Sequence, residues 1–171
     1  MTKLNFILKD EILISIKNIH LHTSNMSDQD AIPMLANVFN EELLNLLKRL
    51  RRSFGDEKLI HTSIRAIELC QKTGDPERPI KDYIINVLPF NSAILKSDID
   101  YFISDKFLDD RKKLSSKMKT DDEIDIIIQI RDKFLSLSQL KNKPLISNIF
   151  NHLQMMSQAS LEYYKRTRPR T

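Results

Sequence analysis

Glycine is almost absent from this chain. Only Gly55 and Gly74 occur among its 171 residues. All-β folds need glycine in their tight turns, and phosphate-binding loops need it where the backbone approaches the phosphate, so neither class fits. One cysteine also excludes a disulfide scaffold. The length suits a single domain that buries a sizeable core.

Apolar side chains recur every three or four residues through most of the sequence, which predicts helices. The clearest stripe runs from Leu35 to Leu50, with acidic and basic side chains on the other face. Ser27, Asp28 or Asp30 can cap the start of this helix, and Pro33 fits its first turn.

A second stripe follows almost immediately. Gly55 sits where a left-handed residue ends the first helix, and Asp56-Glu57 place carboxylates at the positive pole of the next. Apolar residues from Ile60 to Cys70 follow, and Gly74 closes this helix. The very short joint predicts an antiparallel helical hairpin.

The segments on either side of this hairpin carry weaker patterns. We expect a helix over about residues 4–21, although Ile14 and Ile16 leave a strand open. After Gly74, a short helix stops at Pro89. Ser97 then caps a second short turn that ends near Phe102 or Ile103.

The last third alternates between charged and apolar stretches. Residues 104–120, with Leu108, Leu114 and Met118 as their clear apolar anchors, form either a polar helix or an exposed connector. The acidic run at 121–125 opens a long helix, and Pro144 starts the last one.

These segments together predict an all-α fold, an irregular bundle of about six or seven helices with a basic C-terminal tail. The single helical domain spans residues 1–164, and residues 165–171 form the basic extension. No run of about 18 apolar residues occurs, so we expect no membrane span.

The net charge of +4 belongs to the C-terminal extension. Removing its four cations from the 27 basic residues leaves 23, equal to the 23 acidic ones. The body of the protein is therefore neutral. The four cations are Lys165, Arg166, Arg168 and Arg170.

The residues that carry enzyme chemistry do not form a recognisable set. His20 and His22 would diverge on a helix, Glu57 and His61 lack partners for a metal, and Cys70 falls on an apolar stripe. No nucleophile-elbow, Walker or Rossmann pattern occurs. We therefore expect no enzyme activity, no metal and no cofactor.

Two basic segments are the candidate contact sites for a partner or nucleic acid. One is the C-terminal extension, and the other lies at the end of the first hairpin helix. The functional interpretation is contact with phosphate or with an acidic protein. The structural one is a cationic helix end that satisfies its own dipole. The candidates in the hairpin are Lys48, Arg49, Arg51 and Arg52.

Residues 79–103 resemble a motif in uncharacterised helical proteins of nucleocytoplasmic large DNA viruses. Those proteins have a helical hairpin, then a proline-aromatic turn, an acidic-aromatic turn and amphipathic helices. The resemblance implies a viral source and a place in the virion, and it carries over no catalytic residue. The matching residues are Pro89, Phe90, Ile94, Asp100 and Phe102.

These observations predict a non-enzymatic protein–protein interaction or structural role, as a minor virion or capsid-associated protein. The alternative is a nucleic-acid-associated packaging or transcription accessory protein that uses the same basic residues. Its partners would be other virion proteins, or nucleic acid in the alternative. The expected location is intracellular, in the virion or host cytoplasm.

Overall fold

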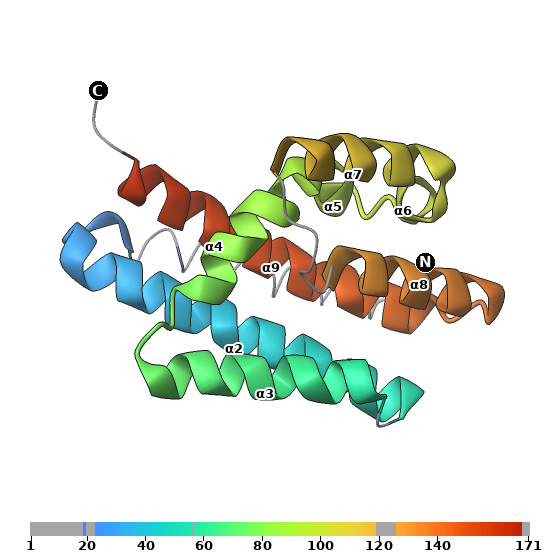
Figure 1. Ribbon diagram of the computed structural model, residues 1–171, viewed down its shortest axis with the longest axis horizontal. Coiled ribbons are helices and arrows are strands. Elements are labelled where there is room, and N and C mark those ends of the chain that lie inside the picture. Colours follow the sequence, from blue (N-terminus) through green and yellow to red (C-terminus); the bar gives the residue numbers. More distant parts are fainter. Residues whose placement is uncertain (1–18, 20–22, 56, 119–125, 169–171) are drawn as a thin grey trace, which may run out of the picture.

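The computed structural model describes residue 19 and residues 23–55, 57–118 and 126–168 (Figure 1). These residues form eight α-helices and one 3-10 turn, and they contain no strand. The elements are α2 (Asp28–Phe54), α3 (Lys58–Thr73), α4 (Arg78–Asn86), η1 (Leu88–Phe90), α5 (Asn91–Leu95), α6 (Ile99–Ile103), α7 (Asp105–Met118), α8 (Ile126–Gln139) and α9 (Lys143–Thr167).

The all-α prediction is confirmed, with more helices than expected. The additional helices arise between residues 78 and 118, where the chain turns repeatedly. Residues 104–120 were left open between helix and connector, and α7 shows that most of them are helical. The predicted N-terminal helix at about 4–21 and the acidic start at 121–125 fall almost wholly outside the described residues.

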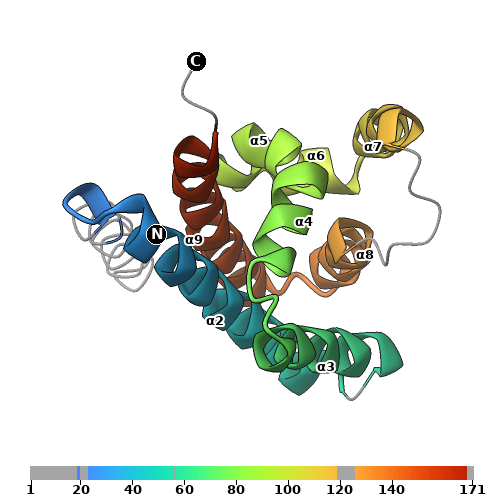
Figure 2. The ribbon, with the colours of Figure 1, turned by 60° about the vertical axis from the view of Figure 1, so that its left-hand side comes forward.

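The predicted hairpin of α2 and α3 is present (Figures 1 and 2). Ser27 caps α2, because its hydroxyl oxygen accepts a hydrogen bond from the backbone N–H of Asp30 at 3.3 Å. Pro33 lies inside α2 and not in its first turn, because this cap starts the helix earlier. Gly55 and Gly74 both have positive φ, and Gly74 has the full left-handed helical conformation.

Helix α9 packs against α2, α4, α5 and α8. It runs antiparallel to α2, because Asp28 at the start of α2 bonds to Arg166 at the end of α9, and Glu42 bonds to His152 near the middle. Helix α4 joins it through Tyr83, whose hydroxyl lies 2.9 Å from that of Ser157. In both ribbon views, the α2–α3 hairpin and helices α5–α7 lie on opposite sides of the molecule (Figures 1 and 2).

Aromatic rings fill the space where α6, α7, α8 and α9 meet. Phe134 and Phe150 stack with centroids 4.7 Å apart. Phe102 contacts both rings, and also Phe107 at 5.3 Å. Phe107 is fully buried and anchors α7, although the sequence pattern around it is dominated by charge. These four rings join the last three long helices into one core.

Polar contacts fix the turn between α3 and α4 to the two longest helices. The buried Asn40 donates from Nδ2 to the carbonyl of Pro76 at 2.8 Å. Glu77 accepts from the Tyr163 hydroxyl at 2.6 Å and pairs with Lys81 at 2.9 Å. The bond from Tyr163, followed by that from Lys81, lowers the pKa of Glu77.

Within the described residues, none of the helices has the length and apolar character needed to cross a membrane.

We expect Phe150→Ala to lower the free energy of unfolding by about 3–5 kcal/mol, because it removes a fully buried ring from the aromatic core. Urea unfolding followed by circular dichroism measures the change. The matched control is Leu140→Ala, since Leu140 is 73% exposed and its loss should cost less than about 0.5 kcal/mol. Equal losses in the two variants would contradict this assignment of the core.

We expect Glu77→Gln to destabilise the fold near neutral pH and to lose that effect in acid. The folded-state pKa of Glu77 is lowered, so its charge stabilises the fold above the ordinary pKa of about 4.5. This contribution disappears as the pH falls through the lower folded value. Urea unfolding across this pH range should show the variant and the natural protein converging. Glu41→Gln, at an exposed position, should show no such convergence.

Candidate functional site

Four cationic side chains surround the C-terminal end of α2. Lys48, Arg49, Arg51 and Arg52 are all exposed, and none forms an ion pair with another described residue. Leu50 between them is only 4% exposed and fixes this helix end to the core. We call these four residues the cationic cluster. Their position at the negative pole of α2 stabilises that helix end whether or not a ligand is present.

Glu57, at the hairpin joint, is held by a side chain of another helix. Lys133 of α8 places its Nζ 2.5 and 2.6 Å from the two carboxylate oxygens of Glu57. The same Nζ lies 4.6 Å from the centroid of the Phe54 ring. Glu57 is therefore neutralised from α8, and this end of the hairpin is fastened to the body of the protein.

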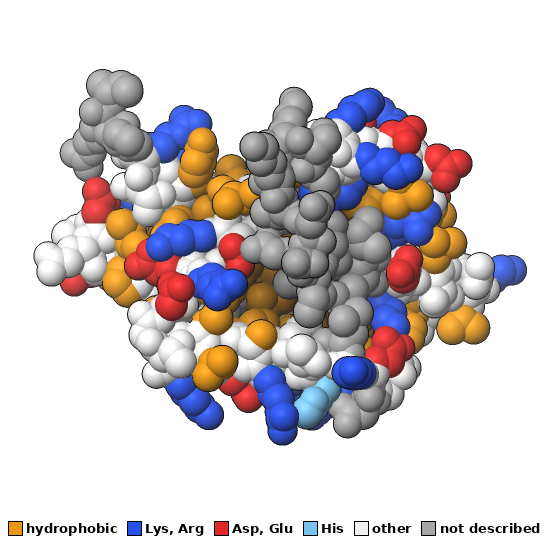
Figure 3. Space-filling view, in the orientation of Figure 1, with side chains coloured by type: hydrophobic (Ala, Val, Ile, Leu, Met, Phe, Trp, Pro, Cys, Tyr) orange, Lys and Arg blue, Asp and Glu red, His pale blue; other side chains and the backbone are white. Residues whose placement is uncertain are grey.

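Helix α3 adds further positive charge to the hairpin. Lys58, Arg65 and Lys72 are exposed along it. Figure 3 shows cationic side chains along the lower edge of the molecule, where α3 runs in Figure 1. The hairpin thus offers an exposed cationic edge on a rigid support.

Arg166, predicted as a contact for a partner, is engaged inside the molecule. Its side chain is 13% exposed, and it bonds to Asp28 at 2.9 Å and to Glu162 at 3.2 Å. Its guanidinium also donates to the backbone carbonyls of Thr23 and Met26. One cation thereby joins the end of α9 to the segment that leads into α2.

The basic C-terminal tail predicted for residues 165–171 is not confirmed. Helix α9 continues through Thr167, because Arg166 lies one turn after Glu162 and pairs with it on the same face. Lys165 also approaches Glu162, at 3.7 Å, and Arg168 lies over the ring of Tyr164 at 4.3 Å. The remaining predicted contact, Arg170, lies outside the described residues.

The structure also places the residues considered for catalysis or metal binding. His152 bonds through Nδ1 to Glu42 at 2.7 Å, and Cys70 is half-buried at the end of α3. Glu57 pairs with Lys133 of α8 and not with His61. In the described part of the chain, no three histidine, cysteine or acidic side chains gather as metal ligands. His20 and His22 lie outside it.

Sequence reasoning missed two of these contacts. The Glu162–Arg166 spacing was the available signal for the first, since oppositely charged residues four apart pair on one helix face. Nothing in the sequence pattern indicates the Lys133–Glu57 pair, because its members are 76 residues apart.

We expect Arg166→Ala to lower the free energy of unfolding by about 3 kcal/mol, because it removes the nearer cation from the buried Glu162 carboxylate and also breaks the pair with Asp28. Urea unfolding measures the loss. Arg168→Ala is the control, since Arg168 is exposed and its removal should change the value by less than about 0.5 kcal/mol. If Arg166→Ala were as stable as this control, Arg166 would be available for a partner after all.

Of the predicted contacts that the structure describes, the cationic cluster, Lys165 and Arg168 are exposed, and Arg166 is not. The cluster differs from Lys165 and Arg168 in having no ion-pair or ring contact with the described residues. Comparison with protein-family models, with curated proteins and with solved structures finds no match for this chain.

Proposed function

We propose that this protein is a non-enzymatic binding protein whose cationic cluster contacts an acidic surface on a protein partner. One observation carries the proposal. Lys48, Arg49, Arg51 and Arg52 are exposed and form no ion pair with the residues that the structure describes, whereas the nearby Glu57 is paired from α8. Cations without such pairs can bind carboxylates outside the molecule.

The residue types suit this role. Three of the four are arginines, and the planar guanidinium binds a carboxylate through two parallel hydrogen bonds. The buried Leu50 and the Lys133–Glu57 pair hold the helix end in place, so the backbone loses little conformational entropy on binding.

The size of the cationic cluster favours protein over nucleic acid. It occupies little more than one helical turn, which rises about 5.4 Å. Duplex DNA carries one charge per about 1.7 Å, and non-specific binding draws its strength from many phosphate contacts. Arg166, which would have added to such a surface, is engaged internally. Nucleic-acid binding is therefore the competing outcome of the test.

We also propose that the partner is a component of a viral particle. This part of the proposal rests only on the likeness of residues 79–103 to helical proteins of large DNA viruses.

The test replaces all four cations of the cationic cluster by glutamine. Binding of a fluorescent poly-glutamate peptide and of a short DNA duplex is measured by anisotropy at low salt. Exposed ion pairs contribute about 0.2–1 kcal/mol each, so the variant should bind the peptide at least about fourfold more weakly. The control, Arg78→Gln with Lys112→Gln, Lys141→Gln and Lys143→Gln, removes the same charge from exposed positions outside the hairpin and should bind normally.

Two results would overturn the proposal. Equal peptide binding by both variants would show that the position of the charges is irrelevant. Tight binding of the duplex, with affinity falling as a high power of salt concentration and lost in the cluster variant alone, would establish the nucleic-acid alternative.

A further inference from the structure

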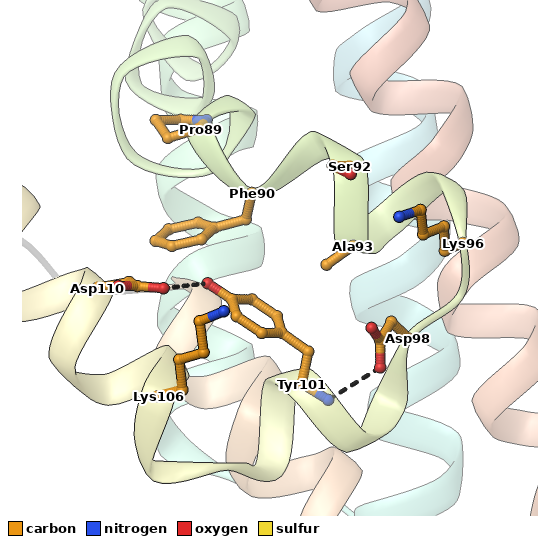
Figure 4. A pocket seen from close by; sticks show the side chains of 9 residues that line it. All are labelled: Pro89, Phe90, Ser92, Ala93, Lys96, Asp98, Tyr101, Lys106 and Asp110. Atoms are coloured by element: carbon orange, nitrogen blue, oxygen red, sulfur yellow. Dashed lines mark hydrogen bonds between the residues drawn. The ribbon is translucent and has the colours of Figure 1, made fainter.

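A small pocket lies where η1, α5, α6 and α7 meet (Figure 4). Helices α5–α7 lie on the side of the molecule opposite the α2–α3 hairpin (Figure 1). Its volume is about 240 Å³. Pockets that enclose whole small-molecule ligands usually measure about 300–1,000 Å³. This pocket therefore suits a group about the size of one large side chain.

Two aromatic rings form the apolar part of the pocket. Phe90 and Tyr101 have ring centroids 6.5 Å apart and are tilted by 42°. Phe90 is 6% exposed and rests against Phe107, so its position is fixed by the core. Ala93 lines the same space from α5 (Figure 4). An apolar side chain entering here would meet surfaces already in place.

The two acidic residues of the pocket already have partners within the chain. Asp98 caps α6, accepting from the backbone N–H of Tyr101 at 3.0 Å. Asp110 accepts from the Tyr101 hydroxyl at 3.1 Å and lies 3.7 Å from Lys113. Burial, and then Asp110, raise the pKa of Tyr101 to about 12, so this hydroxyl keeps its proton and remains a donor to Asp110.

Unlike the two aspartates, the two lysines of the pocket have no such partner in the described part of the chain. Lys96 and Lys106 are exposed, and neither lies within ion-pair distance of a described carboxylate. The Nζ of Lys106 is 6.0 Å from the centroid of the Tyr101 ring. The two lysines stand on either side of the Tyr101 ring (Figure 4). Two lysines and two aspartates line the pocket, so their formal charges balance, but in the described part of the chain only the carboxylates are engaged.

We propose that this pocket binds an acidic peptide segment of a protein partner, with one apolar side chain against the accessible edges of Phe90 and Tyr101 and flanking carboxylates held by Lys96 and Lys106. The two ammonium groups select this occupant, because carboxylates would pair with them, whereas an apolar or a basic segment would not. The pocket is remote from the cationic cluster, so it does not depend on the function proposed for that cluster.

The test uses three short probe peptides and the full-length ¹⁵N-labelled protein. The first is acetyl-Asp-Phe-Asp-amide, which combines charge with an aromatic side chain. In acetyl-Asn-Phe-Asn-amide the charges are removed, and in acetyl-Asp-Ala-Asp-amide the ring is removed. Backbone chemical shifts are followed during titration at low salt. The first peptide should shift the amides of Phe90, Ala93 and Tyr101 saturably, and the other two should bind at least about fivefold more weakly.

Matched variants test the two lysines. Lys96→Gln with Lys106→Gln should weaken binding of the first peptide at least about fivefold. Lys112→Gln with Lys141→Gln removes the same charge at exposed positions outside the pocket and should leave binding unchanged. All four lysines lie on the surface, so we expect both double variants to fold normally. The spectrum of each variant without peptide checks this.

The outcomes separate this proposal from the proposed function. Equal binding of the charged and neutral peptides, or normal binding by the Lys96 and Lys106 variant, would overturn the pocket proposal. Shifts confined to the end of α2, and lost when the cationic cluster is replaced, would also overturn it while supporting the role of the cluster. Shifts at the pocket that persist in the cluster variant support the pocket alone.

Discussion

Burial of helix α9 is the constraint on which the rest of the structure depends. It contacts α2, α4, α5 and α8, so most of its circumference is covered by protein. A helix buried in this way needs partners for its polar side chains. Ser157 is partnered by the Tyr83 hydroxyl of α4. Arg166 is partnered by Asp28 of α2 and by Glu162 within α9. These contacts also fix where α2 begins and where α4 crosses, which in turn position the hairpin and the turn that follows it.

The long helices could be predicted because each has one apolar face and a recognisable end. The stripe from Leu35 to Leu50 and the glycines that follow α2 and α3 were sufficient for the hairpin. The short helices between residues 78 and 118 could not be delimited in this way, because tertiary packing sets their ends. The cap of α6 is Asp98, whose carboxylate accepts from the N–H of Tyr101, and not the predicted Ser97, which lies one residue earlier with a left-handed φ of 52°. Phe107 was overlooked because charged neighbours conceal a single deeply buried ring.

The candidate sites also divide into those set by local sequence and those set by tertiary packing. The cationic cluster was predictable because four cations flank one inward-facing leucine within little more than one turn, and their exposure follows from helical spacing. The internal engagement of Arg166 was predictable only in part, because its spacing from Glu162 indicates that pair, whereas nothing local indicates Asp28, which is 138 residues away. The backbone carbonyls of Thr23 and Met26, which Arg166 binds, leave no mark in the side-chain pattern. The pocket is a product of the packing of α5, α6 and α7, so no local spacing could indicate it.

The distribution of charge determines how far each surface can act. Outside the last seven residues, acidic and basic side chains are equal in number, so this body carries no net charge to attract partners from a distance. Charges are screened beyond about 8–10 Å at physiological salt, so the exposed cations act only on groups almost in contact with them. Charge at this range changes association rate and salt dependence more than it distinguishes between acidic partners. Discrimination has to come from shape and apolar contact, which Phe90 and Tyr101 provide and the cationic cluster, with its leucine turned inward, does not.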